Sequence, residues 1–320
     1  MKQRRAPSAA LAGAAILLGM AGAAQAAGGH CPAVYDAAPC NSFCVRDAVD
    51  PSLVRCDLTA QPGNNALVAV TNYRSIQIAG TATYSAWGTA NGVNFCCAIT
   101  STAVAPVNAL QVLMGGGADD VWLTAFDATG NEKNLSSNVA QTTSLFQGKV
   151  YPGDGDDYVQ GSNSAADNYR DYLTGEDGAD MIYGNKGADF LSAAETRVFS
   201  VQSVDNDGES LYGGNGRDEI VGATNNIIAT DTIFVDGGSQ NDLLCTGPRN
   251  YLTAQQVYFW GGAGDDQIYS YSSFVAGFDG PLDGGSGSDG CDNPGGGTET
   301  ACEAAYNPAL FGAWTPLVCN

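Results

Sequence analysis

The sequence predicts an all-β chain folded as a parallel β-solenoid (a β-roll or β-helix), in which successive coils of strands stack on one another. The first observation behind this prediction is a nonapeptide, G-G-x-G-x-D-x-U-x with U a large apolar residue, that begins at residues 213, 237, 261 and 284. The second is the spacing of these starts, 24, 24 and 23 residues. A near-constant period is typical of stacked repeats, here with one glycine-rich turn in each coil of about 24 residues.

The four repeats keep the pattern to different degrees. Two match at every fixed position (213–221 and 261–269), one has cysteine as U (284–292), and one replaces the third glycine with Gln240 (237–245). An apolar residue stands two positions before each start. One coil therefore reads as strand, glycine turn, strand and a longer return.

Four earlier segments extend the array towards the N-terminus. Residues 115–123 give Asp120 as the sixth residue, and 152–160 follows after a polar insertion. Residues 175–183 and 184–192 are tandem nonapeptides. Because the spacing then returns to about 24 residues, we expect most coils to have a glycine turn on one side only. This expectation predicts one column of stacked turns and casts doubt on a second full column.

Aspartate at the sixth position of every turn predicts a column of carboxylates. Such a column would repel itself without a counter-ion, whereas carboxylate and carbonyl oxygens together are the ligands of a hard cation such as Ca2+. Glycine allows φ > 0 and close approach of neighbouring backbones. The alternative is that these aspartates form Asx turns that only cap the coils. Their repetition in phase favours metal ligands, and the candidates are Asp120, Asp157, Asp180, Asp189, Asp218, Asp242, Asp266 and Asp289, with Gly153, Gly155, Gly178, Gly187, Gly214, Gly216, Gly238, Gly262, Gly264, Gly285 and Gly287.

The nonapeptide resembles the RTX, or hemolysin-type, calcium-binding repeat. Several full or nearly full matches in phase carry this resemblance, which implies a β-roll that binds Ca2+ between successive turns. In the ordinary RTX spacing of nine residues, successive turns fall on opposite sides of a flattened roll. This chain departs from that spacing outside residues 175–192.

The apolar residues around the turns predict two inward ladders. We expect one from Val150, Leu173, Leu211, Val235 and Phe259, and the other from Val159, Ile182, Ile220, Leu244 and Ile268. Residues that alternate with them should face outward, and these include Tyr258, Trp260, Tyr269 and Tyr271. If they form one exposed patch, it could bind carbohydrate or a surface protein. Residues 67–99 are also strand-like, and we interpret them as early irregular coils without the glycine turn.

The chain divides into four predicted parts. Residues 1–26 have a basic start, an apolar stretch and Ala24-Gln25-Ala26, the pattern of a cleaved signal peptide. Residues 27–60 form a cysteine-rich N-terminal cap, 61–292 the solenoid (regular from about 109), and 293–320 a C-terminal cap. No membrane span remains after signal removal, so the mature chain should be secreted or displayed at the surface of a bacterial cell.

All ten cysteines lie after the predicted cleavage site, and an even number in an exported chain indicates disulfides. We expect five, with the cap cysteines pairing among themselves and Cys291, Cys302 and Cys319 fastening the far end. The net charge of −21 argues against nucleic acid, which is bound through basic side chains.

The sequence favours a non-enzymatic role. Its single histidine, His30, excludes most hydrolase constellations, and neither H-E-x-x-H nor G-x-S-x-G is present. The main prediction is an exported calcium-binding solenoid that is structural or binds a ligand. The alternatives are a polysaccharide-active β-helix enzyme using paired carboxylates, or an RTX-like surface adhesin. The acidic pairs are Asp119/Asp120, Asp156/Asp157 and Asp265/Asp266, each at positions five and six of its predicted turn.

Overall fold

The computed structural model describes thirteen segments of the chain. These are residues 43–50, 53–61, 63–72, 81–90, 93–102, 109–124, 147–161, 170–193, 208–222, 232–245, 256–269, 281–292 and 298–305. The predicted signal peptide, Tyr271 and Cys319 lie outside them. Within these segments every regular element is a strand, and no helix is long and apolar enough to cross a membrane.

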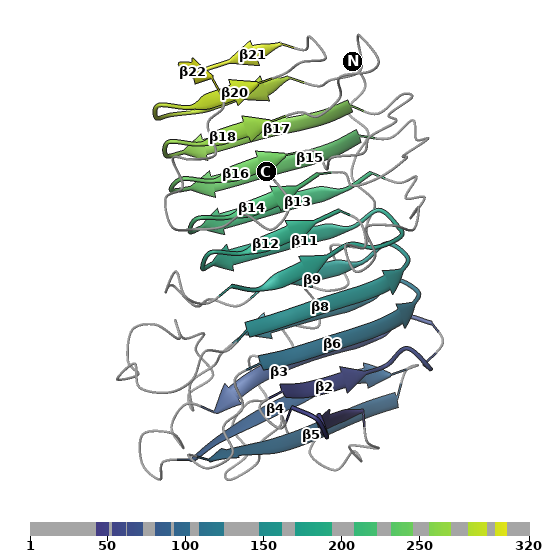
Figure 1. The fold of residues 1–320 in the computed structure, drawn as a ribbon. Coiled ribbons are helices and arrows are strands. Elements are labelled where there is room, and N and C mark those ends of the chain that lie inside the picture. Colours follow the sequence, from purple (N-terminus) through teal and green to yellow (C-terminus); the bar gives the residue numbers. More distant parts are fainter. Residues whose placement is uncertain are drawn as a thin grey trace, which may run out of the picture.

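The strands form two sheets of eleven strands each, stacked along one axis (Figure 1). Sheet A contains, in spatial order, β1 (Cys44–Arg46), β2 (Leu53–Asp57), β6 (Ala109–Gly116), β8 (Gln147–Asp154), β10 (Tyr172–Thr174), β12 (Phe190–Ser192), β14 (Glu219–Val221), β16 (Leu243–Cys245), β18 (Gln267–Tyr269), β20 (Gly290–Asp292) and β22 (Ala304–Ala305). Sheet B contains β21 (Glu299–Thr300), β19 (Leu282–Asp283), β17 (Gln256–Ala263), β15 (Thr232–Ser239), β13 (Ser210–Asn215), β11 (Met181–Lys186), β9 (Tyr158–Gln160), β7 (Asp120–Thr124), β3 (Ala66–Asn72), β4 (Thr81–Ala90) and β5 (Val93–Thr102).

From β6 onward, the chain alternates between the two sheets and each strand pairs in parallel with its equivalent one coil away. This confirms the parallel β-solenoid. The parallel strands carry short apolar and β-branched segments because their inner faces are covered by the opposite sheet. The core lies between the sheets and is fully shielded from solvent along its length.

The inward ladders differ from those predicted. In sheet A the ladder runs through Val150, Leu173, Leu191, Ile220, Leu244, Ile268 and Cys291. In sheet B it runs through Val159, Ile182, Leu211, Val235, Phe259 and Leu282. All of these side chains are buried, as expected, but both predicted ladders mixed residues of the two sheets.

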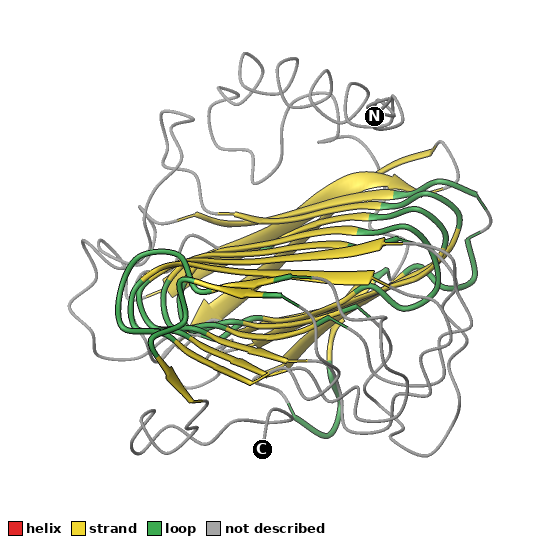
Figure 2. Ribbon diagram, turned by 90° about the horizontal axis from the view of Figure 1, so that it is seen from above, coloured by secondary structure: helices red, strands yellow, loops and turns green. Residues whose placement is uncertain are grey.

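The mixing has a simple cause at the tandem nonapeptides. The turn in 175–183 leads from sheet A to sheet B, whereas the turn in 184–192 leads from sheet B back to sheet A. Every later repeat keeps the second direction, and every earlier one has the first. The glycine turns therefore change edge at this point, and turns stack at both edges of the roll (Figure 2). We call the A-to-B side the first edge and the B-to-A side the second edge.

Residues 66–102 do not form successive irregular coils. Strand β3 continues the parallel stack beside β7, but β3, β4 and β5 pair antiparallel as a meander at the end of sheet B. The prediction for this region was therefore correct in strand content and wrong in topology. Alternation of side chains predicts a strand but carries no information about its direction.

Disulfides join strands at both ends of sheet A. Cys44–Cys56 links β1 to β2, and Cys291–Cys302 links β20 to the turn before β22. Both pairings agree with the prediction for their cysteines. Cys97 and Cys245 are also disulfide-bonded, and no cysteine among the described residues is free. That these disulfides secure caps stays a prediction, as does the total of five.

Glycine is required where neighbouring coils come closest. Gly216 has φ of 149°, and a Cβ added there would lie 1.4 Å from the carbonyl oxygen of Gly187 in the preceding coil. We expect Gly216→Ala to lower the free energy of unfolding by about 2 kcal/mol or more, through backbone strain and displacement of the adjacent turn. Thermal denaturation in saturating calcium measures this loss.

Gly116→Ala is the matched control for this prediction. A Cβ on Gly116 would meet nothing closer than 3.9 Å, and Gly116 is not among the residues with positive φ. An equal loss of stability in both variants would contradict the close-packing explanation.

Candidate metal centre

In every glycine turn after 115–123, the sixth residue is a buried aspartate that links two coils. On the second edge, one carboxylate oxygen of Asp218 accepts a hydrogen bond from the backbone N–H of Asp189, at 2.7 Å. The same contact joins Asp218 N–H to Asp242, Asp242 N–H to Asp266 and Asp266 N–H to Asp289, each at 2.8 Å. One oxygen of each carboxylate thus continues the backbone hydrogen bonding of the parallel sheets around the turn.

The second oxygen of these carboxylates has no partner within the protein. Oδ2 is buried without a hydrogen bond in Asp157, Asp189, Asp218, Asp242, Asp266 and Asp289. The side chains are at most 3 % exposed. A buried acceptor left unsatisfied costs about 1–3 kcal/mol, and more when it is charged. A regular row of such atoms indicates a missing positively charged partner rather than a defect of packing.

On the second edge, each unpaired oxygen lies close to a carbonyl oxygen of the next coil, beside the first glycine of its own turn. A Cβ placed on Gly213 would lie 2.6 Å from Asp218 Oδ2 and 2.5 Å from the carbonyl oxygen of Gly237. The same convergence occurs at Gly237, at 2.7 Å from Asp242 Oδ2 and 2.6 Å from the carbonyl oxygen of Gly261. Glycine is therefore needed at this position because a side chain would displace the two oxygens. Carboxylate and carbonyl oxygens together suit Ca2+.

The column is electrostatically strained without a cation. Burial raises the pKa of Asp218 to about 7, although the hydrogen bond from Asp189 N–H opposes this shift. The pKa of Asp266 also rises to about 7, mainly through burial and further through the charges of Asp289 and Asp265. Burial and the neighbouring Asp218 raise the pKa of Asp242 well above its usual value. Ionised carboxylates in this row therefore need a positive charge close by.

A second column of the same kind occupies the first edge. Asp119 accepts from Asn65 N–H at 2.6 Å, Asp157 from Asp119 N–H at 2.6 Å, and Asp180 from Asp157 N–H at 2.8 Å. Burial raises the pKa of Asp157 to about 9, although the hydrogen bond from Asp119 N–H opposes this shift. The prediction of a single column from Asp157 to Asp289 is therefore wrong, because Asp157 and Asp180 stack on the opposite edge from Asp189 and its successors.

Asp120 does not belong to the first-edge column; Asp119 does. In the register of sheet B, Val121 pairs with Val159 and Asp120 pairs with Tyr158, so the turn is shifted by one residue from the predicted one. Val121 rather than Trp122 then occupies the inward position. Asp120 instead begins β7, and burial together with the charge of Asp119 raises its pKa to about 6.

The predicted glycines lie where the turns need them. All eleven, from Gly153 to Gly287, have φ between 89° and 156°. Three non-glycine residues adopt positive φ at glycine positions of the pattern: Glu176, Asn185 and Gln240, at 73°, 72° and 79°. Substitution at these positions is compatible with the fold, because a turn of the same shape forms there.

Three acidic residues in the columns were missed because the turns in which they lie lack the glycine pattern. Asp171 accepts from Gly148 N–H at 2.8 Å and donates its own N–H to Asp189 at 2.9 Å. Glu209 accepts from Asp180 N–H, and Glu303 from Asp289 N–H. The signal that could have found the first two is an acidic residue two positions before an inward apolar residue, as in Asp171-Tyr-Leu and Glu209-Ser-Leu.

The donor set is distinct from that of a zinc site. Among the described residues, no group of three or more His, Cys, Asp or Glu side chains gathers at one point. Each turn offers a single carboxylate oxygen together with backbone carbonyls, which are hard oxygen ligands. The arrangement therefore fits Ca2+ distributed between successive turns.

The comparison with protein families agrees with this chemistry. A family model described as RTX calcium-binding nonapeptide repeat (4 copies) matches residues 151–191 and 255–272. No curated protein and no solved structure matches the chain. The first matched range contains turns of both edges, and the second contains the turn that ends at Asp266. The chain therefore contains hemolysin-type RTX calcium-binding repeats, and these repeats bind Ca2+.

Proposed function

We propose that this chain is an exported, non-enzymatic calcium-binding solenoid in which stacked Ca2+ ions complete the fold at both edges. The observation that carries the proposal is the row of buried aspartate Oδ2 atoms without a partner, which on the second edge each lie close to a carbonyl oxygen of the adjoining coil. A bound cation supplies the missing partner and the missing charge at once.

The proposed ligands come from two kinds of group. The carboxylates are those of Asp119, Asp157, Asp180, Asp189, Asp218, Asp242, Asp266 and Asp289, with Asp119 replacing the predicted Asp120. The carbonyls are those of the glycine turns that contain the eleven predicted glycines. Ca2+ accepts six to eight oxygen ligands in flexible geometry, so neighbouring turns can share one ion.

Contacts of the acidic pairs support the non-enzymatic role. Asp156 accepts from Ala179 N–H at 3.2 Å, and Asp265 accepts from Ser288 N–H at 3.0 Å. Each of these two carboxylates therefore accepts a hydrogen bond from the turn of the next coil. The other members of the two acidic pairs, Asp157 and Asp266, belong to the columns. This leaves neither pair arranged as the acid and base of a glycosidase, which need a substrate between them.

Export is supported by the predicted leader and by the cysteines. Six cysteines are in disulfides, which persist in oxidising compartments outside the cytosol: Cys44, Cys56, Cys97, Cys245, Cys291 and Cys302. Secretion or display at the cell surface is the proposed location. The partner class stays carbohydrate or a surface protein, and Trp260, 48 % exposed on sheet B, is an aromatic side chain available for such contact.

Calcium titration tests the proposed function directly. Calcium-stripped, oxidised protein should bind on the order of four to six ions, because several turns on each edge offer the same oxygens. Isothermal titration with metal analysis of the loaded protein provides the count. Binding of no ion, or of a single one, at millimolar calcium would rule out the proposal.

Asp242→Asn tests one member of the column. The amide keeps an acceptor for Asp218 N–H but removes the charge. If a site has a Kd of about 10⁻⁴ M, calcium at about 1 mM stabilises the fold by roughly 1.4 kcal/mol per site. We expect the variant to lose the calcium-dependent stabilisation of one or two sites, measured by thermal melts across a calcium series. Asp292→Asn, at the exposed end of β20, is the control and should behave as wild type.

The pH dependence of stability should reverse between the two states. Without calcium, folded-state pKa values of about 7 for Asp218 and Asp266 lie above the ordinary 3.8. The folded state then binds more protons than the unfolded state, so stability should fall as the pH rises from about 4 to 7. With saturating calcium, protons compete with the ion for the same carboxylates, so acidification should destabilise.

Thermal melts of stripped protein at pH 5 and pH 8, with and without added calcium, measure both trends. The same pH trend in both states would contradict the assignment of calcium to these carboxylates.

A further inference from the structure

The stack continues past the last recognisable repeat. After Asp292 the sequence loses the glycine pattern, yet β21 and β22 add another coil. Leu282 N–H donates to Thr298 O at 2.9 Å, and Ala304 N–H donates to Asp289 O at 3.0 Å. Residues 298–305, assigned from sequence to the C-terminal cap, therefore repeat the strand–turn–strand path of the coils before them.

The turn of this coil places two residues where a repeat has its first glycine and its sixth aspartate. In the preceding coil, a Cβ on Gly261 would lie 2.5 Å from the carbonyl oxygen of Gly284 and 2.6 Å from Asp266 Oδ2. At Gly284 the corresponding contacts are the carbonyl oxygen of Ala301, at 2.2 Å, and Asp289 Oδ2, at 2.7 Å. Ala301 has φ of 50°, whereas Gly261 and Gly284 are not among the residues with positive φ, so the backbone of the last turn differs from that of a repeat at this position.

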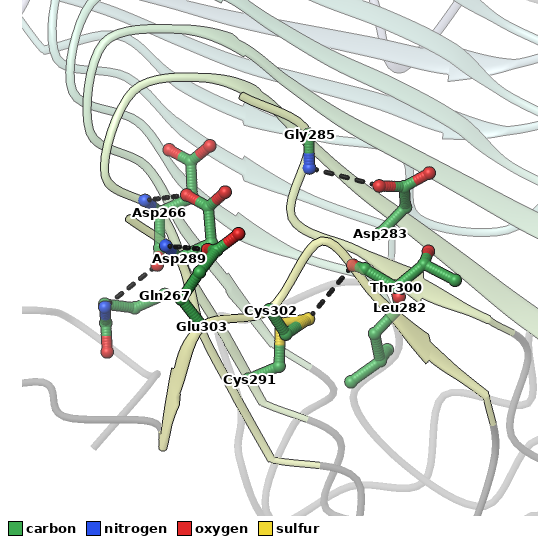
Figure 3. The surroundings of a disulfide bond; sticks show 10 residues. All are labelled: Asp266, Gln267, Leu282, Asp283, Gly285, Asp289, Cys291, Thr300, Cys302 and Glu303. Atoms are coloured by element: carbon green, nitrogen blue, oxygen red, sulfur yellow. Dashed lines mark hydrogen bonds between the residues drawn. A yellow bond between two sulfur atoms is a disulfide. The ribbon is translucent and has the colours of Figure 1, made fainter. Parts of the chain in front are cut away.

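Glu303 continues the row of carboxylates. Its Oε2 accepts from Asp289 N–H at 3.0 Å, just as Asp289 accepts from Asp266 N–H at 2.8 Å. Figure 3 shows the carboxylates of Asp266, Asp289 and Glu303 one after another along the edge. Glutamate has one methylene more than aspartate, which lets it reach this place from a turn of different sequence.

Asp289 itself indicates that a ligand belongs here. Its side chain is fully buried, and its Oδ2 has no hydrogen-bond partner. Asp266 Oδ2 in the preceding coil has the same surroundings, with a glycine carbonyl in place of that of Ala301. An unsatisfied carboxylate oxygen and a carbonyl oxygen of the next coil therefore lie together between the last two coils, as they do between two glycine repeats.

From this similarity we infer that the second-edge column ends in an additional Ca2+ site, held by Asp289 Oδ2, the Ala301 carbonyl and the Glu303 carboxylate. Asp289 belongs to the last nonapeptide, whereas Ala301 and Glu303 lie outside every nonapeptide and stand in place of repeat residues. It rests on the proposed function, since the ion is the one that the other turns bind.

The disulfide Cys291–Cys302 holds the turn of the last coil, which lacks the glycine pattern of the repeats. Cys291 occupies the inward position of β20, and Cys302 lies between the two new ligand residues in the turn. The bond therefore fixes the turn of the last coil against the coil before it (Figure 3). Calcium binding at this end should depend on the oxidised state of the pair, whereas the earlier sites should not.

Glu303→Gln tests the site in the full, oxidised chain. The amide keeps an acceptor for Asp289 N–H and removes the charge, so a purely structural role survives the change. Native mass spectrometry across a calcium series should show one ion fewer than wild type, or a tenfold or greater weakening of one ion. Glu299→Gln, the same change in β21 of the same coil, is the control and should retain the wild-type count.

The possible results separate this site from the proposed function. If wild type binds no calcium, the proposed function fails. If wild type binds several ions and Glu303→Gln binds the same number equally well, the terminal site alone is overturned. An equal loss in Glu299→Gln would also overturn it, because net charge would then explain the effect. A Cys291→Ser/Cys302→Ser variant should lose or weaken one ion and keep the rest, and an unchanged count would refute the role of the disulfide.

Discussion

The structure depends on one buried carboxylate per turn whose two oxygens make different contacts. Oδ1 accepts a backbone N–H of the adjoining coil and so fixes the distance and register between coils. On the second edge, Oδ2 lies close to a carbonyl oxygen beside a glycine and has no hydrogen-bond partner in the protein. Hydrogen bonding alone therefore satisfies half of each carboxylate, and a cation is needed for the other half. The positive φ values of the glycines, the absence of a Cβ at the first glycine and the raised pKa values all follow from this arrangement.

The two edges carry these carboxylates over different parts of the solenoid axis. The first edge carries its aspartates in the N-terminal coils and ends at Glu209, while the second begins at Asp171 and continues to Glu303. In the middle coils both edges have a carboxylate, as with Asp180 and Asp189 on either side of β11. The glycine turns move from the first edge to the second at the tandem nonapeptides, because nine residues span one strand and one turn. A spacing of about 24 residues returns the chain to the same edge instead.

The sequence predicted most of what is local and little of what depends on register. The nonapeptide is sufficient for the parallel coils, the positive φ of Gly216 and the burial of Ile268, because each follows from residue types within one turn. It could not decide between Asp119 and Asp120, since both follow the glycines and only pairing with β9 selects Val121 as the inward residue. Which edge a turn occupies depends on the path of the preceding strand, so Asp157 was grouped with Asp189. Glu303 was missed because the fold, rather than a glycine pattern, shapes its turn.

The central claim is that calcium, beyond packing and disulfides, holds the coils together. The most direct measurement is the melting temperature of oxidised wild-type protein, stripped of metal, before and after calcium is restored. Five sites at about 1.4 kcal/mol each would contribute roughly 7 kcal/mol at about 1 mM calcium, comparable with the net stability of a typical domain. A large rise in melting temperature on adding calcium, absent with magnesium at the same concentration, is the predicted result. A melting temperature that does not change with calcium would show that apolar ladders and disulfides suffice, and would contradict the account.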